Sequence, residues 1–324
     1  MRILVTGGAG FIGANLVRAC LAHDHEIVVL DDLSTGNLDN LEGTDVSFIR
    51  GSVTDATTVR RAASDVDSIV HLAARGSVPR SLKDPVATHE VNATGTLNVL
   101  EAARLSRGQQ VIMASSSSVY GANPELPKHE DGATRPMSPY AASKLAAEGY
   151  AIAYRTAYDL PTLAFRFFNV FGRFQSAGHA YAAVIPSFID AALRGETLTV
   201  HGDGTQSRDF THVDTVCATI CQAINSRTTS PDPINLAFGT RTTLLEVIET
   251  LSSKLDQPIV VENVENRVGD VPHSQADSSK LRDLFGDIDP VDFSSGLVDT
   301  IEWMRSQFAP RSSATPLSTG SRAA

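Results

Sequence analysis

The stretch VTGGAGFIG, residues 5–13, places glycines at positions 7, 10 and 13 between a short apolar strand and an amphipathic helix. Gly7 allows the tight turn, Gly10 lets the backbone approach a pyrophosphate, and Gly13 lets the helix pack closely on the strand. The beginning of the helix offers N–H groups and a positive dipole end to phosphates. A glycine-rich turn alone is weak evidence, but with a strand before it and a helix after it this stretch predicts a dinucleotide-binding crossover.

An acidic residue at the end of the next expected strand, residues 25–31, supports this interpretation. Asp31 follows Gly13 by 18 residues, where a carboxylate accepts hydrogen bonds from an adenosine ribose. It would repel a 2′-phosphate, so the sequence favours NAD over NADP. Turn formation by DDLSTGN, residues 31–37, is the alternative explanation of Asp31 and Asp32. A P-loop ATPase is a poorer interpretation, because no Lys-Ser/Thr pair follows the glycines.

Strand and helix patterns alternate through the first half of the chain. Apolar strands are expected at residues 2–7, 25–31, 46–51, 66–74, 109–116 and 161–169, with helices at 11–23, 89–105 and 139–157. Continuous apolar strands that alternate with helices are typical of a parallel sheet covered on both faces. We therefore predict an α/β fold with a Rossmann-type, doubly wound parallel sheet.

The pattern changes after residue 169, where a smaller mixed α/β unit begins. Helices are expected at 184–195, 213–226 and 243–255, a hairpin at 198–210, a strand at 258–264, and a strand at 233–239 that returns to the large sheet. We predict an NAD-binding domain at 1–170, with a return segment near 210–238, and an interleaved substrate-binding domain at 171–308. The small, polar tail at 309–324 is expected to be disordered.

Composition excludes several classes of protein. Hydrophobic residues make up 42% of the 324 residues, which suits a well-filled core, and the net charge of −10 argues against a nucleic-acid or anionic-membrane surface. No apolar run approaches the roughly 20 residues of a membrane span, and no signal peptide precedes the first strand, so a cytoplasmic protein is expected. Cys20, Cys217 and Cys221 lack zinc spacing, so we expect buried apolar thiols and no metal site.

A tyrosine and a lysine four residues apart begin the long helix expected at 139–157. Ser138 is expected to cap this helix and Pro139 to start its first turn, which places Tyr140 and Lys144 on one face. Ionising a tyrosine at pH 7 requires about 4 kcal/mol, and a nearby ammonium and the helix N-terminus both lower this requirement. Tyr140 is thus a candidate general base for a hydroxyl. A chance Tyr-x-x-x-Lys pair in an ordinary helix is the alternative.

The stretch SSSSVYG, residues 115–121, ends the strand expected at 109–116. Ligands bind at the carboxyl ends of parallel strands. Ser116 is therefore a candidate to share a hydrogen bond with the hydroxyl that reaches Tyr140, and a simple surface turn is the alternative.

Together these motifs resemble the extended short-chain dehydrogenase/reductase family, most closely its bacterial nucleotide-sugar 4-epimerases. The likeness includes SVPRS (77–81), RFFNVFGRFQ (166–175), AYAAVIPSF (180–188), GDGTQSRDFTHVDTV (202–216), NLAFGT (235–240) and GDVPHSQADSSKL (269–281), and so covers residues 1–290. The resemblance implies NAD as cofactor, a nucleotide sugar as substrate, and Ser116, Tyr140 and Lys144 as catalytic residues.

The resemblance also implies which residues hold the two ligands. The implied NAD-binding residues are Gly7, Gly10, Phe11, Ile12, Gly13, Asp31, Asp32, Ser34, Thr35, Gly36, Asn37, Ser52, Val53, Leu72, Ala73, Ala74, Asn92, Tyr140 and Lys144. The implied substrate-binding residues are Ser116, Ser117, Asn169, Ala183, Val184, Arg208, Phe210, Arg267, Asp270 and Ser274. The two arginines suit phosphates, because a guanidinium donates in a fork.

Departures from related enzymes bear on the reaction. The 4,6-dehydratases place Asp-Glu where this chain has Ser117 and Ser118, and decarboxylating relatives usually carry a glutamate there. Two hydroxyls cannot serve as acid and base for elimination, so the resemblance implies 4-epimerisation through a 4-keto sugar, with NAD recycled. Ser52 stands where relatives usually have an aspartate toward the adenine. Arg75 stands in a position that is often uncharged, and is consistent with an acidic sugar or with solvent exposure.

The identity of the sugar depends on a position beside its C2 substituent. In the family a large aromatic there restricts the pocket to glucose and galactose, and the matching residue here is Ser274, which leaves room for an N-acetyl group. We expect UDP-glucose and UDP-galactose, UDP-GlcNAc and UDP-GalNAc, or both pairs, with dTDP as an alternative nucleotide. UDP-glucuronate 4-epimerisation or decarboxylation, and a non-catalytic NAD-sensing protein, are alternatives. The resemblance also implies a homodimer through a four-helix interface of residues 92–105 and 141–157.

Overall fold

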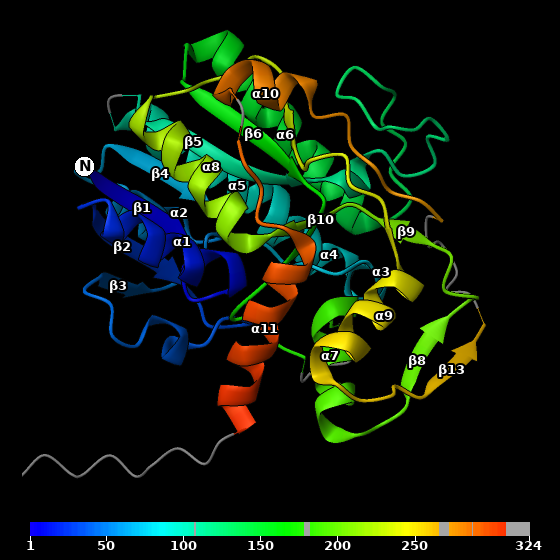
Figure 1. Cartoon of the computed structure of the whole chain (residues 1–324). Helices are drawn as coiled ribbons and strands as arrows, with labels where there is room; N and C mark the ends of the chain where they lie inside the picture. Colours follow the sequence, from blue (N-terminus) through cyan, green and yellow to red (C-terminus); the bar gives the residue numbers. More distant parts are fainter. Residues whose placement is uncertain (107, 178–181, 266–271, 287, 309–324) are drawn as a thin grey trace, which may run out of the picture.

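The computed structural model describes residues 1–106, 108–177, 182–265, 272–286 and 288–308. A seven-stranded parallel sheet forms its centre, in the order β11-β6-β5-β4-β1-β2-β3 (Figure 1). The strands are β1 (Arg2–Thr6), β2 (Glu26–Asp31), β3 (Ser47–Arg50), β4 (Ser68–His71), β5 (Gln110–Ser116), β6 (Thr162–Phe167) and β11 (Ile234–Leu236). The predicted Rossmann-type sheet is confirmed, and so is the return of the strand expected at 233–239, which pairs with β6.

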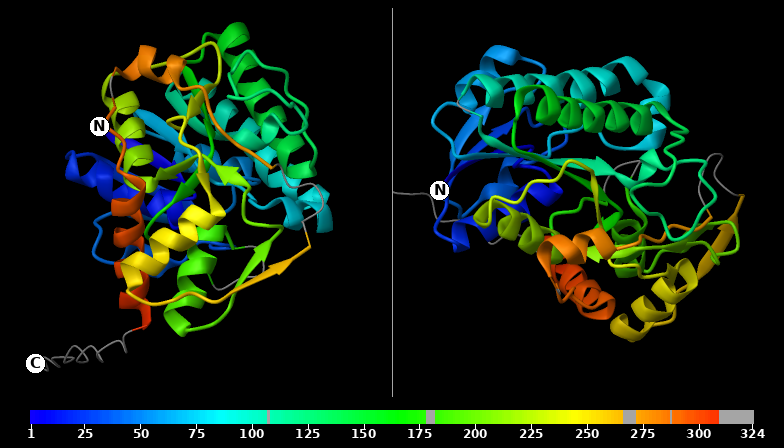
Figure 2. Two further views of the ribbon diagram at one scale, coloured as in Figure 1. Left: turned by 45° about the vertical axis from the view of Figure 1, so that its right-hand side comes forward. Right: turned by 90° about the horizontal axis from the view of Figure 1, so that it is seen from above.

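Both faces of this sheet are covered, because successive side chains of a strand point to opposite sides. Ile3 and Val5 of β1 belong to one apolar cluster with α1 (Phe11–Ala22) and α8 (Val213–Asn225). Leu4 belongs to a second cluster with α2 (Ala56–Ala62) and α5 (Gly95–Leu105). The right-hand view of Figure 2 shows α5 and α6 (Pro139–Tyr158) side by side above the sheet. The strands are continuously apolar because neither face meets water.

A smaller group of elements lies beside the sheet (Figure 1). These elements surround an apolar cluster of their own. The helices of this group are α7 (Val184–Arg194), α9 (Leu244–Leu255) and α11 (Phe293–Phe308), and its strands are β7 (Asn169–Phe171), β8 (Leu198–His201), β9 (Ser207–Arg208), β10 (Phe210–His212), β12 (Thr242–Thr243) and β13 (Val261–Val264). The helices predicted at 184–195, 213–226 and 243–255 are confirmed. The tail at 309–324, predicted to be disordered, lies outside the described residues.

The prediction of a hairpin at residues 198–210 is wrong. β8 pairs in parallel with β13, β9 pairs antiparallel with β12, and β10 pairs in parallel with β7. Gly202 and Gly204 do form a turn, with φ of +81° and +83°. However, a turn only changes the direction of the chain. The buried side chains of Leu198 and Val200 pack with α7 and α9, so long-range packing decides the pairing.

The helix predicted at 89–105 is interrupted. α4 (Pro85–His89) is followed by one π-helical turn, η2 (Glu90–Thr94), before α5 begins. Such turns frequently occur at functional sites, and this one holds the buried side chain of Asn92. The sequence did not reveal it, because an irregularity of one turn hardly disturbs the apolar spacing on either side. Five α-helices of the described residues were not predicted. Four of them, α2, α3 (Val78–Lys83), α4 and α10 (Ser279–Phe285), have at most seven residues, whereas α11 has 16.

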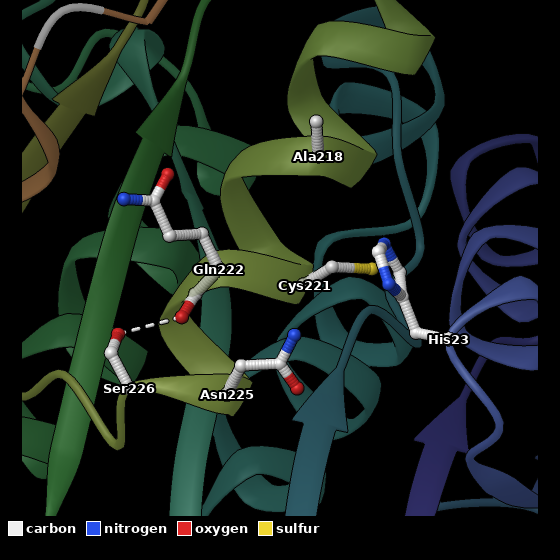
Figure 3. A pocket seen from close by; sticks show the side chains of 6 residues that line it. All are labelled: His23, Ala218, Cys221, Gln222, Asn225 and Ser226. Atoms are coloured by element: carbon white, nitrogen blue, oxygen red, sulfur yellow. Dashed lines mark hydrogen bonds between the residues drawn. The ribbon is translucent and has the colours of Figure 1, made fainter.

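The three cysteines are free and buried, as predicted. The sulfur atoms of Cys20 in α1 and Cys221 in α8 lie 3.6 Å apart. Figure 3 shows Cys221 beside His23 in a surface pocket near the ends of these helices. Because α1 ends before β2 begins, this pocket lies at the amino ends of the strands, the edge opposite to the one where ligands bind in such sheets. No described helix is long and apolar enough to cross a membrane.

Candidate active site

The glycine turn between β1 and α1 has no room for side chains. Gly7 has φ of +73°, and a Cβ added there would lie 2.7 Å from the backbone nitrogen of Ala73. A Cβ on Gly13 would lie 2.1 Å from the carbonyl oxygen of Gly7. Gly10 begins α1 without a side chain that caps it, so the first N–H groups of the helix have no side-chain acceptor there. This cradle fits the pyrophosphate of a dinucleotide, which needs close backbone approach and a helix N-terminus.

Asp31, at the end of β2, holds the glycine turn in place. Its Oδ2 accepts a hydrogen bond from the Ala9 N–H at 3.0 Å, and its Oδ1 accepts from the Leu33 N–H at 2.8 Å. Burial raises the pKa of Asp31, and these two hydrogen bonds oppose the rise. A carboxylate oxygen has two lone pairs, so ribose hydroxyls can still donate to Asp31. The turn explanation also holds in part, because Asp32 accepts from the Ser34 N–H at 2.9 Å.

The other candidate NAD-binding residues lie on segments that reach the same edge of the sheet. A Cβ on Gly36 would lie 3.0 Å from Ala9, so the turn of Ser34, Thr35 and Gly36 packs on the glycine loop, and the Asn37 N–H donates to the Ala9 carbonyl. The remaining candidates are Phe11 and Ile12 in the first turn of α1, Ser52 and Val53 after β3, and Leu72, Ala73 and Ala74 after β4. Ser52 shares a hydrogen bond with Thr54, in a local turn.

Asn92, in the π turn, connects three segments of the site. Its Oδ1 accepts from the Arg75 N–H at 2.7 Å, and its Nδ2 donates to the Ser143 Oγ at 2.9 Å. The Arg75 side chain extends to Asp84, with 3.0 Å between Nη2 and Oδ2. Asn92 thereby fixes the loop after β4 against α6, the helix that carries Tyr140 and Lys144.

Ser116, Tyr140 and Lys144 converge at the carboxyl end of β5. Ser138 caps α6 by accepting from the Ala141 N–H at 3.1 Å, and Pro139 begins the helix, as predicted. Lys144 is buried, and its Nζ donates to the Ala114 carbonyl at 2.8 Å. Tyr140 forms a hydrogen bond with Ser116. The Oγ of Ser116 also accepts from the Oγ of Ser118 at 2.9 Å, within the short helix η3 (Ser117–Val119).

The net shift of the Tyr140 pKa in the protein alone is upward, whereas the sequence indicated only groups that lower it. Burial raises the pKa of Tyr140, and the hydrogen bond with Ser116 only partly opposes this rise. Burial also lowers the pKa of Lys144 to about 8. The same burial that brings the pair together therefore disfavours both charged forms, and an acidic phenol needs a further positive charge at the site.

The candidate substrate-binding residues lie beyond the ends of β5 and β6. Ser116 pairs with Phe167 in the sheet, which places Asn169, at the start of β7, next to the carboxyl end of β5. Phe210 in β10 pairs with Asn169, and the Ser274 N–H donates to the Ser207 carbonyl at 3.0 Å. Ser117 is the first residue of η3, Arg208 ends β9, and Ala183 and Val184 begin α7. Arg267 and Asp270 lie outside the described residues.

This arrangement agrees with a family of known enzymes. The model of the NAD dependent epimerase/dehydratase family matches residues 3–237. The chain belongs to this family. It is accordingly an NAD-dependent enzyme, and the close backbone approach at Gly7 and Gly13 fits the pyrophosphate of this cofactor.

Individual members of the family cover nearly the whole chain. The UDP-glucose 4-epimerase of Mycolicibacterium smegmatis is 37% identical over 95% of this chain and 99% of its own. The structure of UDP-N-acetylglucosamine 4-epimerase from Methanobrevibacter ruminantium in complex with UDP-N-acetylmuramic acid is 36% identical, with a TM-score of 0.90 over 94% of this chain and 98% of its own. Thermus thermophilus UDP-glucose 4-epimerase in complex with NAD is 34% identical, with a TM-score of 0.86 over 94% and 99% of the two chains. Other relatives are named dehydratases and decarboxylases.

The enzyme has a buried ion pair next to Ser115, the residue that precedes the candidate catalytic Ser116. The Arg166 Nε donates to the Glu148 Oε2 at 3.0 Å, and the Ser115 Oγ donates to the same oxygen at 2.8 Å. Both charged side chains are at most 4% exposed. The pair fixes the end of β5 against α6. Sequence reasoning missed Glu148, although its position four residues after Lys144 places it on the same face of the helix.

One cluster of metal-ligating side chains occurs in the described part of the enzyme. His212, Asp214 and Asp299 bring ligand atoms within 4.8 Å of one another. Arg173 donates to Asp214 at 2.8 Å and to Asp299 at 3.2 Å. Since the guanidinium already donates to both carboxylates, the cluster fits an ion-pair network better than a cation site.

The lowered pKa of Lys144 predicts a pH-dependent contribution to the enzyme's stability. Below about pH 8 the folded protein buries an ammonium that the unfolded chain keeps in water, so Lys144 destabilises the fold. As pH rises from about 8 toward 10, the folded state has lost this proton and the unfolded state still holds it, so the destabilisation is relieved. The expected quantity is the free energy of unfolding of the wild-type protein without NAD, minus that of the Lys144→Met variant. Between about pH 8 and 10 we expect this difference to rise by about 1.4 kcal/mol per pH unit. Urea unfolding at stepped pH measures this difference, and a flat profile would contradict the burial argument.

Proposed function

We propose that the chain is an NAD-dependent UDP-sugar 4-epimerase that inverts C4 of UDP-glucose and UDP-galactose, of UDP-GlcNAc and UDP-GalNAc, or of both pairs. The observation that carries this proposal is the pair of hydroxyl side chains at Ser117 and Ser118, next to the converging Ser116, Tyr140 and Lys144. Elimination of water needs a further acid and base, which two hydroxyls do not supply, and decarboxylating relatives usually carry a glutamate at this position. Inversion at C4 needs only a base for the hydroxyl and a hydride acceptor.

The proposed mechanism assigns each of these side chains a task. The Tyr140 oxygen takes the proton of the sugar 4-hydroxyl and returns it when the inverted hydroxyl forms. The Ser116 Oγ, which accepts a hydrogen bond from Ser118, can donate to the same sugar oxygen and hold it near Tyr140. Bound NAD supplies the hydride acceptor and the positive charge that favours the phenolate. Lys144 adds to this charge while it is protonated, below about pH 8.

The nucleotide diphosphate is proposed to bind along β7, β9 and β10. Asn169, Arg208 and Phe210 lie on these strands, and the uncapped N-terminus of α7 at Ala183 and Val184 offers N–H groups to a phosphate. The UDP-bound relatives support a uridine nucleotide for this chain. A dTDP-sugar differs little in shape at these positions, and the test below includes one.

A second candidate is 4-epimerisation of an acidic UDP-sugar such as UDP-glucuronate, for which Arg75 is the specific observation. The ion pair with Asp84 counts against it, because Arg75 already has a carboxylate partner. A probable UDP-glucuronate 4-epimerase of Rhizobium meliloti is 30% identical to the chain, so the scaffold is compatible with such a substrate. A non-catalytic NAD sensor is less well supported, because a sensor does not need a general base such as Tyr140 with Lys144 beside it.

Incubation of the purified protein with single nucleotide sugars tests the proposed function. UDP-glucose, UDP-GlcNAc, UDP-glucuronate and dTDP-glucose are incubated separately, and the products are separated by anion-exchange chromatography. We expect a 4-epimer from at least one of the first two and no carbon dioxide from UDP-glucuronate. A 4-keto-6-deoxy product, carbon dioxide release, or an epimer from UDP-glucuronate alone would overturn the proposal.

Ser274 is proposed to leave space for an N-acetyl group at C2. Ser274→Tyr should reduce kcat/KM for UDP-GlcNAc by about 100-fold, because the ring fills the space of the acetyl group, and should change UDP-glucose turnover by less than about threefold. Steady-state assays with both sugars measure the ratio. Ser253→Tyr, on an exposed turn of α9, is the matched control. Equal losses with both sugars would contradict this role of Ser274.

We also propose a homodimer through α5 and α6. Apolar side chains on these helices are exposed, with Leu105 at 57%, Tyr150 at 40% and Ile152 at 37%. Packing against the same helices of a second copy would form a four-helix interface. Light scattering on the purified protein measures its mass, and a monomer at micromolar concentration would contradict the interface.

A further inference from the structure

Asp209 has no role in the site described so far, although it lies between Arg208 and Phe210. Its side chain is 0% exposed. Burying a carboxylate is unfavourable unless donors surround it, so its position requires an explanation.

The Asp209 side chain binds two loops. Its Oδ2 accepts from the N–H groups of Gly239 and Ala276, each at 3.0 Å, and its Oδ1 accepts from the Thr240 Oγ1 at 2.9 Å. Gly239 and Thr240 follow β11, and Ala276 belongs to the segment that carries Ser274. The carboxylate thus connects the end of the large sheet with the wall of the proposed C2 pocket.

The Asp209 backbone faces the other way. Its carbonyl oxygen accepts from the backbone N–H of Asn169 at 3.1 Å and from the Asn169 side-chain nitrogen at 3.4 Å. This bond is part of the pairing between β10 and β7. One residue therefore contacts the segments of Asn169 and Ser274 at the same time.

The carboxylate also completes a strand ladder that the backbone leaves unfinished. The Ser207 N–H donates to the Pro272 carbonyl at 3.1 Å, and the Ser274 N–H donates to the Ser207 carbonyl at 3.0 Å, as in a parallel pair. Continuing that pattern, the Ala276 N–H would bond to the Asp209 carbonyl. That carbonyl already accepts a hydrogen bond from the Asn169 N–H, so the Ala276 N–H donates to the Asp209 carboxylate instead.

We propose that Asp209 is the positioning residue that sets the register of the Ser274 segment against Asn169 and Arg208, and thereby shapes the subsite for the nucleotide sugar. This inference rests on the proposed function. An aspartate suits this position because the donors around it act on both oxygens. In an asparagine the NH₂ group either opposes the Gly239 and Ala276 N–H groups or replaces the hydrogen bond that the Thr240 hydroxyl donates, so the Thr240 hydrogen must turn away. Displacing the segment would shift Ser274 and the Pro272 carbonyl to which Arg208 donates at 3.1 Å.

The test compares the NAD-loaded Asp209→Asn enzyme with wild type and with Asp203→Asn, which changes an exposed aspartate that accepts hydrogen bonds from the nearby Thr205. Calorimetric titration with UDP measures the subsite without the reaction, and steady-state assays with UDP-glucose and UDP-GlcNAc give kcat and KM. For Asp209→Asn we expect the Kd for UDP and the KM for both sugars to rise about tenfold or more, with kcat within about threefold of wild type. The kcat/KM ratio of the two sugars should also change, and Asp203→Asn should match wild type.

Bound NAD and the unfolding midpoint distinguish positioning from a general structural role. In Asp209→Asn, bound NAD should stay near wild type and the unfolding midpoint should fall by only a few degrees, because part of the buried hydrogen bonding is lost. A parallel loss of bound NAD, stability and kcat would overturn the inference. If Asp209→Asn does not fold, Thr240→Val removes one donor and keeps the carboxylate, and is expected to weaken UDP binding about threefold. Unchanged UDP affinity in the folded variants would also overturn it. If the wild-type protein binds UDP but epimerises no sugar, only the proposed function is contradicted. If it does not bind UDP, the proposed function and the inference about Asp209 are both contradicted.

Discussion

Replacement of Tyr140 by phenylalanine is expected to reduce 4-epimerisation by about 10²–10⁴-fold, the range contributed by a positioned general base. The substitution removes one oxygen and leaves the ring in place. Lys144 keeps its hydrogen bond to the Ala114 carbonyl, and Ser116 keeps the one from Ser118, so the remaining site should hold its shape. The affinity for UDP should change little, because Tyr140 acts on the sugar. Coupled assays at saturating substrate measure kcat, and calorimetry measures UDP binding.

Tyr150→Phe is the matched control for this prediction. Tyr150 lies on the same helix with 40% of its surface exposed, and losing its hydroxyl should leave kcat unchanged. Since burial raises the pKa of Tyr140, the wild-type protein without NAD should show no phenolate absorbance at neutral pH. A Tyr140→Phe enzyme with wild-type kcat would exclude Tyr140 as the base.

Replacement of Gly13 by alanine is expected to abolish stable NAD binding. The new Cβ would lie 2.1 Å from the Gly7 carbonyl oxygen and 2.7 Å from the Gly8 Cα, both of them backbone atoms that cannot turn aside. The turn and the start of α1 must separate, which moves the cradle away from the pyrophosphate. We expect the affinity for NAD to fall about 100-fold or more, equivalent to about 3 kcal/mol. The NAD released from purified protein by acid, and titration of the stripped protein with NAD, measure this loss.

The same substitution at Gly149 is expected to leave NAD binding intact. Gly149 lies inside α6, and a Cβ there would meet no atom within 4 Å. Gly149→Ala should therefore keep full NAD occupancy and stabilise the protein by about 0.5–1 kcal/mol, because alanine restricts the unfolded chain. Full occupancy in Gly13→Ala would show that the turn tolerates a side chain and would contradict the cradle as described.

Much of the fold could be predicted from the sequence because its signals are local. The glycine turn between β1 and α1, the Ser138–Pro139 start of α6 and the apolar strands of the sheet each depend on neighbouring residues. The convergence of Ser116, Tyr140 and Lys144 was also predictable, because a parallel sheet brings the carboxyl ends of its strands to one edge. Glu148 could have been found by the same helical spacing that selected Lys144.

Other features depended on contacts between distant segments. The sequence of residues 198–210 contains a turn, yet β8 pairs with β13, whose residues begin at Val261. The π turn around Asn92, the pairing of Arg75 with Asp84 and the donors around Asp209 have no local signature. In each case the partner is chosen by the packing of elements far apart in the chain.

The amino-acid sequence by itself determined the Rossmann-type sheet, the glycine cradle and the choice of candidate reactive side chains. Only the tertiary structure decided the direction in which the pKa values of Tyr140 and Lys144 shift, and how Asp209 joins the segments of Asn169 and Ser274. The physical reason is that turns, caps and periodicity act over a few residues. Burial and hydrogen-bond partners are set by all the segments that surround a side chain in the folded protein.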